Sequence, residues 1–221
     1  MRSDFGRFID HTLLRPTATT PDIARLCSEA VTYGMAAVCV FPSHVALASE
    51  AVRGTSVKVA TVIAFPFGVT LTDAKASELR AAASEGADEV DIVINVSLLK
   101  SGNTSGVENE MHVLNDLARN LGVVTKFIME TGYLTADEKT RVCAMANRVR
   151  PAFMKTSTGH AASGATVEDV TLMRAALVPE IQIKAAGGIR SLGEALALLN
   201  AGASRIGTSS GVAIVEESRK L

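Results

Sequence analysis

Residues 86–94 of the chain read Gly-Ala-Asp-Glu-Val-Asp-Ile-Val-Ile, a glycine followed closely by a continuous run of apolar, mostly β-branched residues. A glycine at this place is typical of a helix end, and a continuous apolar run is typical of a strand covered on both faces. The same joint recurs at 34–38 (Gly-Met-Ala-Ala-Val) and at 202–206 (Gly-Ala-Ser-Arg-Ile). Three copies of one helix-to-strand joint indicate that a single supersecondary unit is used repeatedly.

The whole chain alternates short apolar runs with longer amphipathic segments. The segments begin with helix signals, such as Thr20-Pro21-Asp22, where Thr20 is expected to be the N-cap, and the capping-box spacings at Thr135…Glu138 and Ser191…Glu194. Units of roughly 25–30 residues fit a single-domain α/β fold, a closed (β/α)8 TIM barrel, better than an open sheet. Neither GxGxxG nor GxxxxGK[ST] is present. The expected strands lie at 8–13, 36–41, 58–65, 89–94, 123–130, 152–156, 181–186 and 204–208, and 101–106 (Ser-Gly-Asn-Thr-Ser-Gly) is expected to be a flexible connection.

Length and composition limit the classes of function. The chain has 221 residues, a length that suits one domain over 1–221. Charged residues make up 20% of it and the formal net charge is -1, so the protein has no overall electrostatic field to attract nucleic acid or an anionic membrane. Residues 1–10 lack the apolar segment of a signal peptide, and no apolar run approaches the length of a membrane span. Cys27, Cys39 and Cys143 form neither a disulfide framework nor a zinc pattern, so we expect reduced thiols and a cytoplasmic location.

Charged residues interrupt the apolar runs in places where a barrel carries its active site. Such sites lie at the C-terminal ends of the strands, and we place Asp10, Asp91, Lys155 and Lys184 there. The two lysines fall on consecutive strands, which lie about 4.8 Å apart. Burial and a neighbouring cation both lower a lysine pKa, and a neutral amine can form a Schiff base with an aldehyde. The alternative is that each lysine is only a structural ion-pair partner.

Two glycine-rich loops indicate a phosphate site. One follows the seventh expected strand, at 187–190 (Gly-Gly-Ile-Arg), and the other follows the eighth, at 207–211 (Gly-Thr-Ser-Ser-Gly). Barrels often bind phosphate with these two loops and the N-terminus of a final helix. The sequence therefore predicts a small phosphorylated ligand. It predicts no metal site, because the histidines are scattered without ligand spacing, at His11, His44, His112 and His160. We also expect no cofactor.

The run Phe-Met-Lys-Thr-Ser-Thr-Gly at 153–159 closely resembles the Schiff-base motif of the deoxyribose-phosphate aldolases. Further resemblance to this family, in order along nearly the whole chain, is carried by 9–14 (Ile-Asp-His-Thr-Leu-Leu), 37–40 (Ala-Val-Cys-Val), 89–95 (Glu-Val-Asp-Ile-Val-Ile-Asn), 183–190 (Ile-Lys-Ala-Ala-Gly-Gly-Ile-Arg) and 205–211 (Arg-Ile-Gly-Thr-Ser-Ser-Gly).

The resemblance implies a class I, metal-free aldolase of deoxyribose catabolism. It would reversibly cleave 2-deoxy-D-ribose 5-phosphate to D-glyceraldehyde 3-phosphate and acetaldehyde. By the same analogy Lys155 is the Schiff-base lysine, Lys184 lowers its pKa and joins proton transfer, Asp91 relays protons, and Asp10 supports that relay. The family also implies a homodimer or higher homo-oligomer. The residues that would hold the phosphate are Gly159, Gly187, Gly188, Ser209 and Ser210.

A few positions differ from the family's common pattern: Arg15, Phe41, Gly132 and His160. They lie off the implied catalytic set and concern substrate-tail contacts and loop packing. Cys39 matches a cysteine near the family's substrate pocket, and we interpret it as a buried small apolar residue. Three other functions stay open at this point: another Schiff-base aldolase or a transaldolase, an isomerase-type phosphate barrel that uses carboxylates, and a non-catalytic sugar-phosphate binder.

Overall fold

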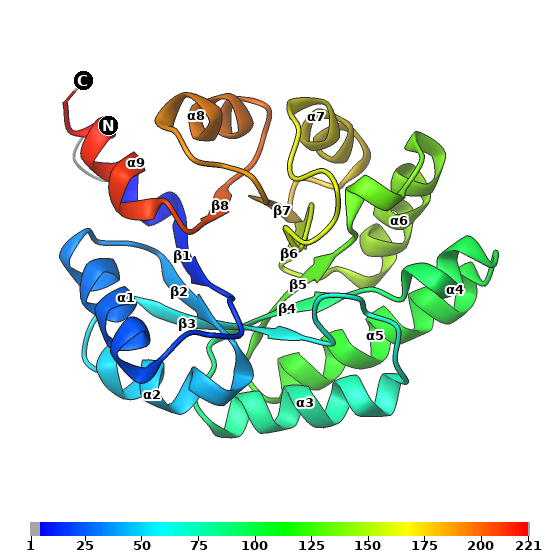
Figure 1. Cartoon of the computed structure of the whole chain (residues 1–221). Helices are drawn as coiled ribbons and strands as arrows, with labels where there is room; N and C mark the ends of the chain where they lie inside the picture. The colour runs from blue at the N-terminus through cyan, green and yellow to red at the C-terminus, as the bar shows by residue number, and fades with distance from the viewer. Residues whose placement is uncertain (1–4, 221) are drawn as a thin grey trace.

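Eight parallel strands close into a barrel in the computed structural model, which describes residues 5–220. Each strand pairs with its neighbour in sequence, and β8 pairs with β1, so the prediction of a (β/α)8 barrel is confirmed. Figure 1 shows the strands at the centre of the molecule with the helices in a ring around them. Residues 1–4 and 221 lie outside the described residues. Part of the segment 1–10 and the last position of the expected domain 1–221 therefore fall outside them.

The strands lie where the continuous apolar runs predicted them, each within about three residues of the expected ends. Because the helices cover the outside of the barrel and the strands cover one another inside, most strand positions are buried, and this burial selects the continuous apolar pattern. The strands are β1 (Ile9–Leu13), β2 (Ala37–Val40), β3 (Lys58–Ile63), β4 (Glu89–Val93), β5 (Val124–Ile128), β6 (Phe153–Lys155), β7 (Gln182–Ala186) and β8 (Arg205–Thr208).

The α-helices are α1 (Thr20–Thr32), α2 (Val45–Ala51), α3 (Thr72–Ser84), α4 (Val96–Lys100), α5 (Thr104–Asn120), α6 (Ala136–Val149), α7 (Val167–Ala176), α8 (Leu192–Asn200) and α9 (Gly211–Ser218), and 3-10 turns lie at η1 (Phe5–Phe8), η2 (Pro42–His44) and η3 (Thr131–Tyr133). Both predicted capping boxes, at the starts of α6 and α8, are present. The described part of the chain contains no helix with the length and apolar character needed to cross a bilayer.

Two local predictions were wrong. The N-cap of α1 is Thr19 rather than Thr20, because Thr19 and Asp22 make the reciprocal capping-box contacts. The segment 101–106 is not a flexible connection: the Asn103 side chain accepts a hydrogen bond from the Gly106 backbone N–H at 2.9 Å and caps the first turn of α5. Asparagine is a strong N-cap residue, so a loop-like composition here encodes a helix start.

The inside of the barrel is built from layers of side chains contributed by alternate strands. The layer nearest the mouth contains Cys39, Asp91, Lys155 and Gly207, the middle layer contains Asp10, Ala60, Lys126 and Lys184, and the lowest layer contains Ala37, Glu89, Phe153 and Arg205. Bulky branched residues usually dominate such layers. Here β2 and β3 supply small apolar residues, and the other strands supply mainly charged residues.

Candidate active site

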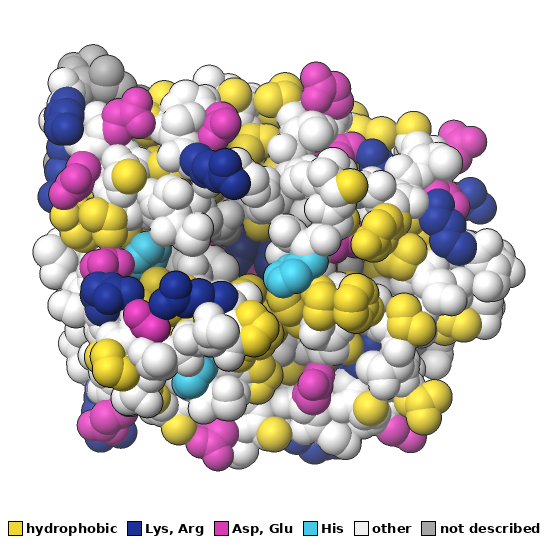
Figure 2. Space-filling model, viewed as in Figure 1, with side chains coloured by type: hydrophobic (Ala, Val, Ile, Leu, Met, Phe, Trp, Pro, Cys, Tyr) yellow, Lys and Arg dark blue, Asp and Glu magenta, His cyan; other side chains and the backbone are white. Residues whose placement is uncertain are grey.

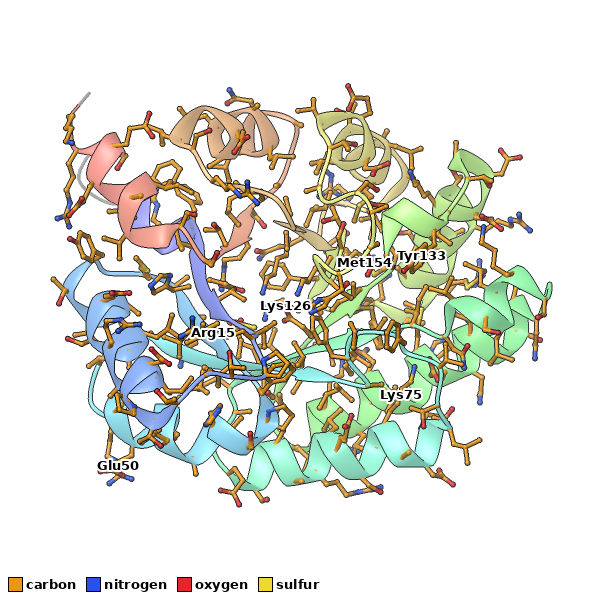
Figure 3. All side chains as sticks on the ribbon, viewed as in Figure 1. Arg15, Glu50, Lys75, Lys126, Tyr133 and Met154 are labelled. Carbon is orange, nitrogen blue, oxygen red and sulfur yellow. The ribbon has the colours of Figure 1, made fainter. Side chains whose placement is uncertain are left out.

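The barrel interior holds a cluster of charged side chains, all from strands: Asp10, Glu89, Asp91, Lys126, Lys155, Lys184 and Arg205. Figure 3 shows Lys126 near the centre of the ring of strands. The prediction that all four residues lie at strand ends is correct for one of them and wrong for the other three. Lys155 is the last residue of β6, but Asp10, Asp91 and Lys184 lie within β1, β4 and β7, in the layers described above.

Lys155 and Lys184 meet at a single carboxylate oxygen. The two residues are register partners on neighbouring strands, as the sequence predicted. Their Nζ atoms each lie 2.7 Å from Oδ2 of Asp91, and both donate a hydrogen bond to it. Lys184 Nζ also lies 2.5 Å from Oδ2 of Asp10. The structure therefore brings together the four residues selected from the sequence, with Asp91 as the bridge between the two amines.

Three further charged residues belong to this cluster and were not predicted from the sequence. Lys126 Nζ lies 2.9 Å from Oδ1 of Asp91 and 2.6 Å from Oε2 of Glu89. Arg205 Nη1 lies 2.6 Å from Oδ1 of Asp10 and 3.5 Å from Oε2 of Glu89. Lys126 interrupts an apolar strand in the same way as Lys155 and Lys184, so that signal could have found it.

The three lysines of the cluster respond differently to burial. Burial disfavours the charged form of Lys184, but Asp10 and Asp91 outweigh that effect and raise its pKa. The pKa of Lys126 is raised in the same way, by Asp91 and Glu89 acting against burial. In Lys155 burial dominates, with Lys184 as a further lowering influence and Asp91 only partly opposing them, so its pKa is lowered.

The carboxylates stay ionised because cations surround them. Burial alone would raise the pKa of Asp91, but Lys126, Lys155 and Lys184 hold it well below its usual range. Asp10 is likewise held low against burial, by Lys184, Lys126 and Arg205. Each of these carboxylates already has cationic partners, and within residues 5–220 no group of three or more His, Cys, Asp or Glu side chains is placed to hold a metal ion.

A cavity of about 470 Å³ opens above Lys155 at the C-terminal ends of the strands. Loops after β6, β7 and β8 form one of its walls, and Figure 2 shows a hollow near the centre of this face with Lys and Arg side chains around it. Of the residues predicted for phosphate, Gly159, Gly187, Gly188 and Ser209 line this cavity. Ser210 does not line it and is instead the N-cap of α9.

The loop after β7 requires glycine. Gly187 and Gly188 have φ of 96° and 79°, in the left-handed region. A Cβ on Gly187 would also lie 3.0 Å from the Cα of Gly164. Backbone N–H groups can approach an anion closely where no side chain intervenes, so this loop has the properties of a phosphate cradle.

Two of the four residues that differ from the family's common pattern lie at the cavity, and Phe41 and Gly132 do not line it. Arg15 and His160 line the cavity, together with Arg190. The His160 ring meets the Phe65 ring edge-on at 5.0 Å, and Phe41 meets Phe65 at 6.2 Å. The cavity mouth therefore carries Arg15, Arg190 and His160, which suits a phosphorylated ligand, and Phe65 packs against the His160 ring.

Cys39 is fully buried among Ala37, Ala60 and Val62. Burial raises the pKa of its thiol, so it is the neutral small residue that the sequence suggested.

A barrel that places a buried lysine of lowered pKa beside a carboxylate, under glycine-rich loops, has the architecture of a lysine-dependent aldolase. A family model described as DeoC/LacD family aldolase matches residues 7–217, and the chain belongs to this family. The predicted resemblance is thereby confirmed, and an aldolase is favoured over the isomerase and the non-catalytic binder.

Similar proteins agree with this assignment. The chain is 50% identical over 218 residues to a deoxyribose-phosphate aldolase of Thermococcus gammatolerans, covering 98% of this chain and 97% of the relative. It is 49% identical over 216 residues to a deoxyribose-phosphate aldolase of Geobacillus sp., covering 98% and 96%. A solved structure of deoxyribose phosphate aldolase from Aeropyrum pernix, described as tetrameric, superposes with a TM-score of 0.90 at 32% identity, covering 96% of this chain and 89% of that one.

Proposed function

We propose that this protein is a class I aldolase that reversibly cleaves 2-deoxy-D-ribose 5-phosphate to D-glyceraldehyde 3-phosphate and acetaldehyde, in the catabolism of deoxyribose. The observation that carries the proposal is Lys155: a buried lysine of lowered pKa that borders the cavity and donates to Asp91. The choice of deoxyribose 5-phosphate as the substrate is based on the names of relatives that are about half identical to this chain, which are deoxyribose-phosphate aldolases.

The reaction begins at Lys155. Its neutral Nζ attacks the aldehyde carbon of the open-chain sugar, and loss of water gives an iminium ion that acts as an electron sink. The water leaves with a proton donated by a neighbouring acid, and Lys184 is placed to supply it through Asp91 Oδ2, which lies 2.7 Å from both amines. Asp10, 2.5 Å from Lys184 Nζ, keeps that lysine charged between turnovers.

The carbon–carbon bond then breaks. Asp91, directly or through a bound water, removes the proton of the C3 hydroxyl, and the C2–C3 electron pair flows into the C1 iminium to leave an enamine, while C3 becomes the aldehyde carbon of glyceraldehyde 3-phosphate. Glyceraldehyde 3-phosphate departs, the enamine carbon is protonated, and water releases acetaldehyde from Lys155. The chemistry needs no cofactor, because the cationic imine withdraws the electrons.

The phosphate end of the substrate is assigned to the loops after β6, β7 and β8. Gly159, Gly187, Gly188 and Ser209 border the cavity there, and Ser210 begins α9, whose N-terminus carries a partial positive charge. The distance between these loops and Lys155 is spanned by one continuous cavity, so one sugar phosphate can reach both.

Reductive trapping tests the proposal. Incubation with acetaldehyde and cyanoborohydride, followed by peptide mass analysis, should place one ethyl adduct on Lys155 of the wild type. Lys155→Leu should leave no adduct, while Lys75→Met, which removes a buried lysine outside the barrel, should be trapped as the wild type is. A wild type without an adduct on Lys155 would contradict the Schiff-base mechanism.

Substrate assays test the sugar. Cleavage of deoxyribose 5-phosphate should be faster than cleavage of fructose phosphates. The reverse order would assign the protein to another Schiff-base aldolase or a transaldolase, which keeps Lys155 and changes the substrate.

We also propose a cytoplasmic homodimer or higher homo-oligomer. The location is supported by Cys27, Cys39 and Cys143, which are all buried and free. The assembly is supported by the Aeropyrum pernix relative, which is tetrameric. Light scattering on the purified protein would show a mass at least twice 23.1 kDa, and a monomer would contradict the proposal.

A further inference from the structure

Lys126, Glu89 and Arg205 do not border the cavity above Lys155. Lys126 lies in the middle layer of the barrel with Asp10 and Lys184, and Glu89 and Arg205 lie in the lowest layer. They nevertheless contact the same two carboxylates that the catalytic lysines use, through the opposite oxygen atoms. Oδ2 of Asp91 binds Lys155 and Lys184, and its Oδ1 binds Lys126. Oδ2 of Asp10 binds Lys184, and its Oδ1 binds Arg205.

Glu89 closes this arrangement from below. Its Oε2 lies 2.6 Å from Lys126 Nζ and 3.5 Å from Arg205 Nη1, so Glu89 connects these two cations. The side chain of Glu89 is 7% exposed and that of Lys126 is fully buried. A carboxylate so poorly solvated is held by its cationic partners rather than by water.

The charges of the cluster can be counted. Three carboxylates, Asp10, Glu89 and Asp91, face four basic groups, Lys126, Lys155, Lys184 and Arg205. A buried cluster with unmatched charge is strongly disfavoured, so the cluster is more stable when one of its basic groups is deprotonated. Arginine keeps its proton, and Lys126 and Lys184 each contact two carboxylates within 3 Å, whereas Lys155 contacts one.

We propose that Lys126, Glu89 and Arg205 are positioning residues that set the protonation of Lys155. The cations Lys126 and Arg205 favour neutral Lys155, and Glu89 opposes them. Together with Asp10, Asp91 and Lys184 they form a network of three carboxylates and three cations, which is balanced when Lys155 is neutral. This inference rests on the proposed function, in which neutral Lys155 is the nucleophile. These three positioning residues act through Asp91 and Asp10 and do not contact the substrate. The reactivity of the site is therefore determined partly by side chains outside the cavity.

The other groups around Lys155 leave this count unchanged. Cys39 on β2 is a neutral thiol because burial raises its pKa, and β3 presents the apolar Val62 to the interior. Glu130, after β5, accepts hydrogen bonds from Thr158 and takes no part in the cluster's ion pairs. The basic groups at the cavity mouth, where solvent screens them, are Arg15, His160 and Arg190.

The test is the acid limb of kcat/KM for deoxyribose 5-phosphate, measured against pH together with the rate of reductive trapping on Lys155. Glu89→Gln removes one negative charge, so Lys155 should lose its proton more easily and the limb should move to lower pH. Lys126→Met removes one positive charge and should move the limb to higher pH. Charges at such separations change a buried pKa by about 1–2 units.

The double variant Glu89→Gln/Lys126→Met restores the balance, with Asp10 and Asp91 against Lys184 and Arg205. Its limb should return to within about 0.5 pH unit of the wild type. Lys75→Met is the matched control: it breaks a buried lysine–glutamate pair of the same kind outside the barrel and should leave the limb in place. If Lys126→Met does not fold, Arg205→Met removes the other cation that contacts Glu89 and should shift the limb to higher pH.

The outcomes separate this inference from the proposed function. Absence of a Lys155 adduct in the wild type overturns the Schiff-base mechanism itself. A trapped wild type whose limb stays in place in Glu89→Gln, or moves in the same direction in the two single variants, overturns the inference and leaves the mechanism standing. Opposite shifts with return in the double variant support it, since a loss of packing alone would not reverse sign.

Discussion

The molecule contains two buried lysine–carboxylate systems with different compositions. Between α3 and α5, Lys75 Nζ lies 2.7 Å from Oε1 of Glu110 and donates to the Val93 carbonyl oxygen at 2.7 Å, and Glu110 also accepts from the Asn95 backbone N–H at 3.2 Å. One cation faces one carboxylate there. Figure 3 shows Lys75 beside α3, away from Lys126 at the barrel centre, where four basic groups face three carboxylates.

Burial lowers the pKa of both Lys75 and Lys155. A lowered pKa therefore does not by itself identify the reactive lysine. Lys155 differs in bordering the 470 Å³ cavity and in being the unmatched cation of its cluster, whereas Lys75 has its own carboxylate and does not line that cavity. Reactivity needs access and unmatched charge together, and the Lys75 pair is the structural counterpart that lacks both.

The largest expected effect is the loss of turnover in Lys155→Leu. Removing the nucleophile should lower kcat by at least about 10³-fold, because the remaining groups cannot form the iminium. Its stability should change by less than about 1.5 kcal/mol, since the other charges of the barrel still match one another. Steady-state kinetics and urea unfolding would measure the two quantities. Turnover within tenfold of the wild type would show that another residue carries the reaction.

Lys75→Met should show the reverse behaviour. It leaves Glu110 buried without its cation and removes the hydrogen bond to Val93, so the free energy of unfolding should fall by about 3–5 kcal/mol. Acetaldehyde and cyanoborohydride should still form the adduct on Lys155 in this variant. Urea midpoints at constant m-value would measure the loss, and Lys75→Met/Glu110→Leu should recover most of it. A single variant as stable as the wild type would show that the pair contributes little.

The barrel carboxylates should dominate the acid side of stability. Because the pKa values of Asp10 and Asp91 are lowered from 3.8, both groups stabilise the fold above about pH 3.8, and this stabilisation is lost as pH falls below that value. Each should contribute a slope of about 1.4 kcal/mol per pH unit there. Unfolding measured at pH 5, 4 and 3 should show a smaller slope in Asp10→Asn. An equal slope in the variant would mean that Asp10 is not ionised in the fold.

The sequence predicted the fold more completely than the site. Continuous apolar runs located every strand because strands of a barrel are covered on both faces. The same continuity hides which residues point inward, since no alternation marks the faces. Lys155 and Lys184 were therefore recognised as charges in apolar strands, while Lys126, which gives the same signal, was not, and the height of Asp10 and Asp91 within the barrel could not be predicted.

Other contacts depend on long-range geometry that local patterns do not encode. Lys75 reads as an ordinary helix residue, yet it is fully buried because Glu110, 35 positions away, and the end of β4 meet it. Arg205 and Glu89 lie 116 positions apart and meet only when the barrel closes. The proposed assignment of Lys155 as nucleophile rests on the motif at 153–159 and on the count of charges in the barrel.

The smallest expected effect concerns an exposed counterpart of the Lys75 pair on the same helix. Glu108 of α5 accepts two hydrogen bonds from Arg148 of α6, at 2.5 and 2.7 Å, just as Glu110 of α5 accepts from Lys75 of α3. The Arg148 side chain is 57% exposed, so water solvates both partners once the pair is broken.

Arg148→Met should therefore lower the melting temperature by less than about 2 °C, and 1 M salt should lower the wild type toward the variant. Differential scanning calorimetry of Arg148→Met beside Lys75→Met would compare the two pairs directly. A loss in Arg148→Met as large as that in Lys75→Met would mean that geometry outweighs solvation in joining α5 to its neighbours. A much smaller loss, as we expect, assigns the difference to burial, because both pairs contain one cation, one glutamate and the same helix.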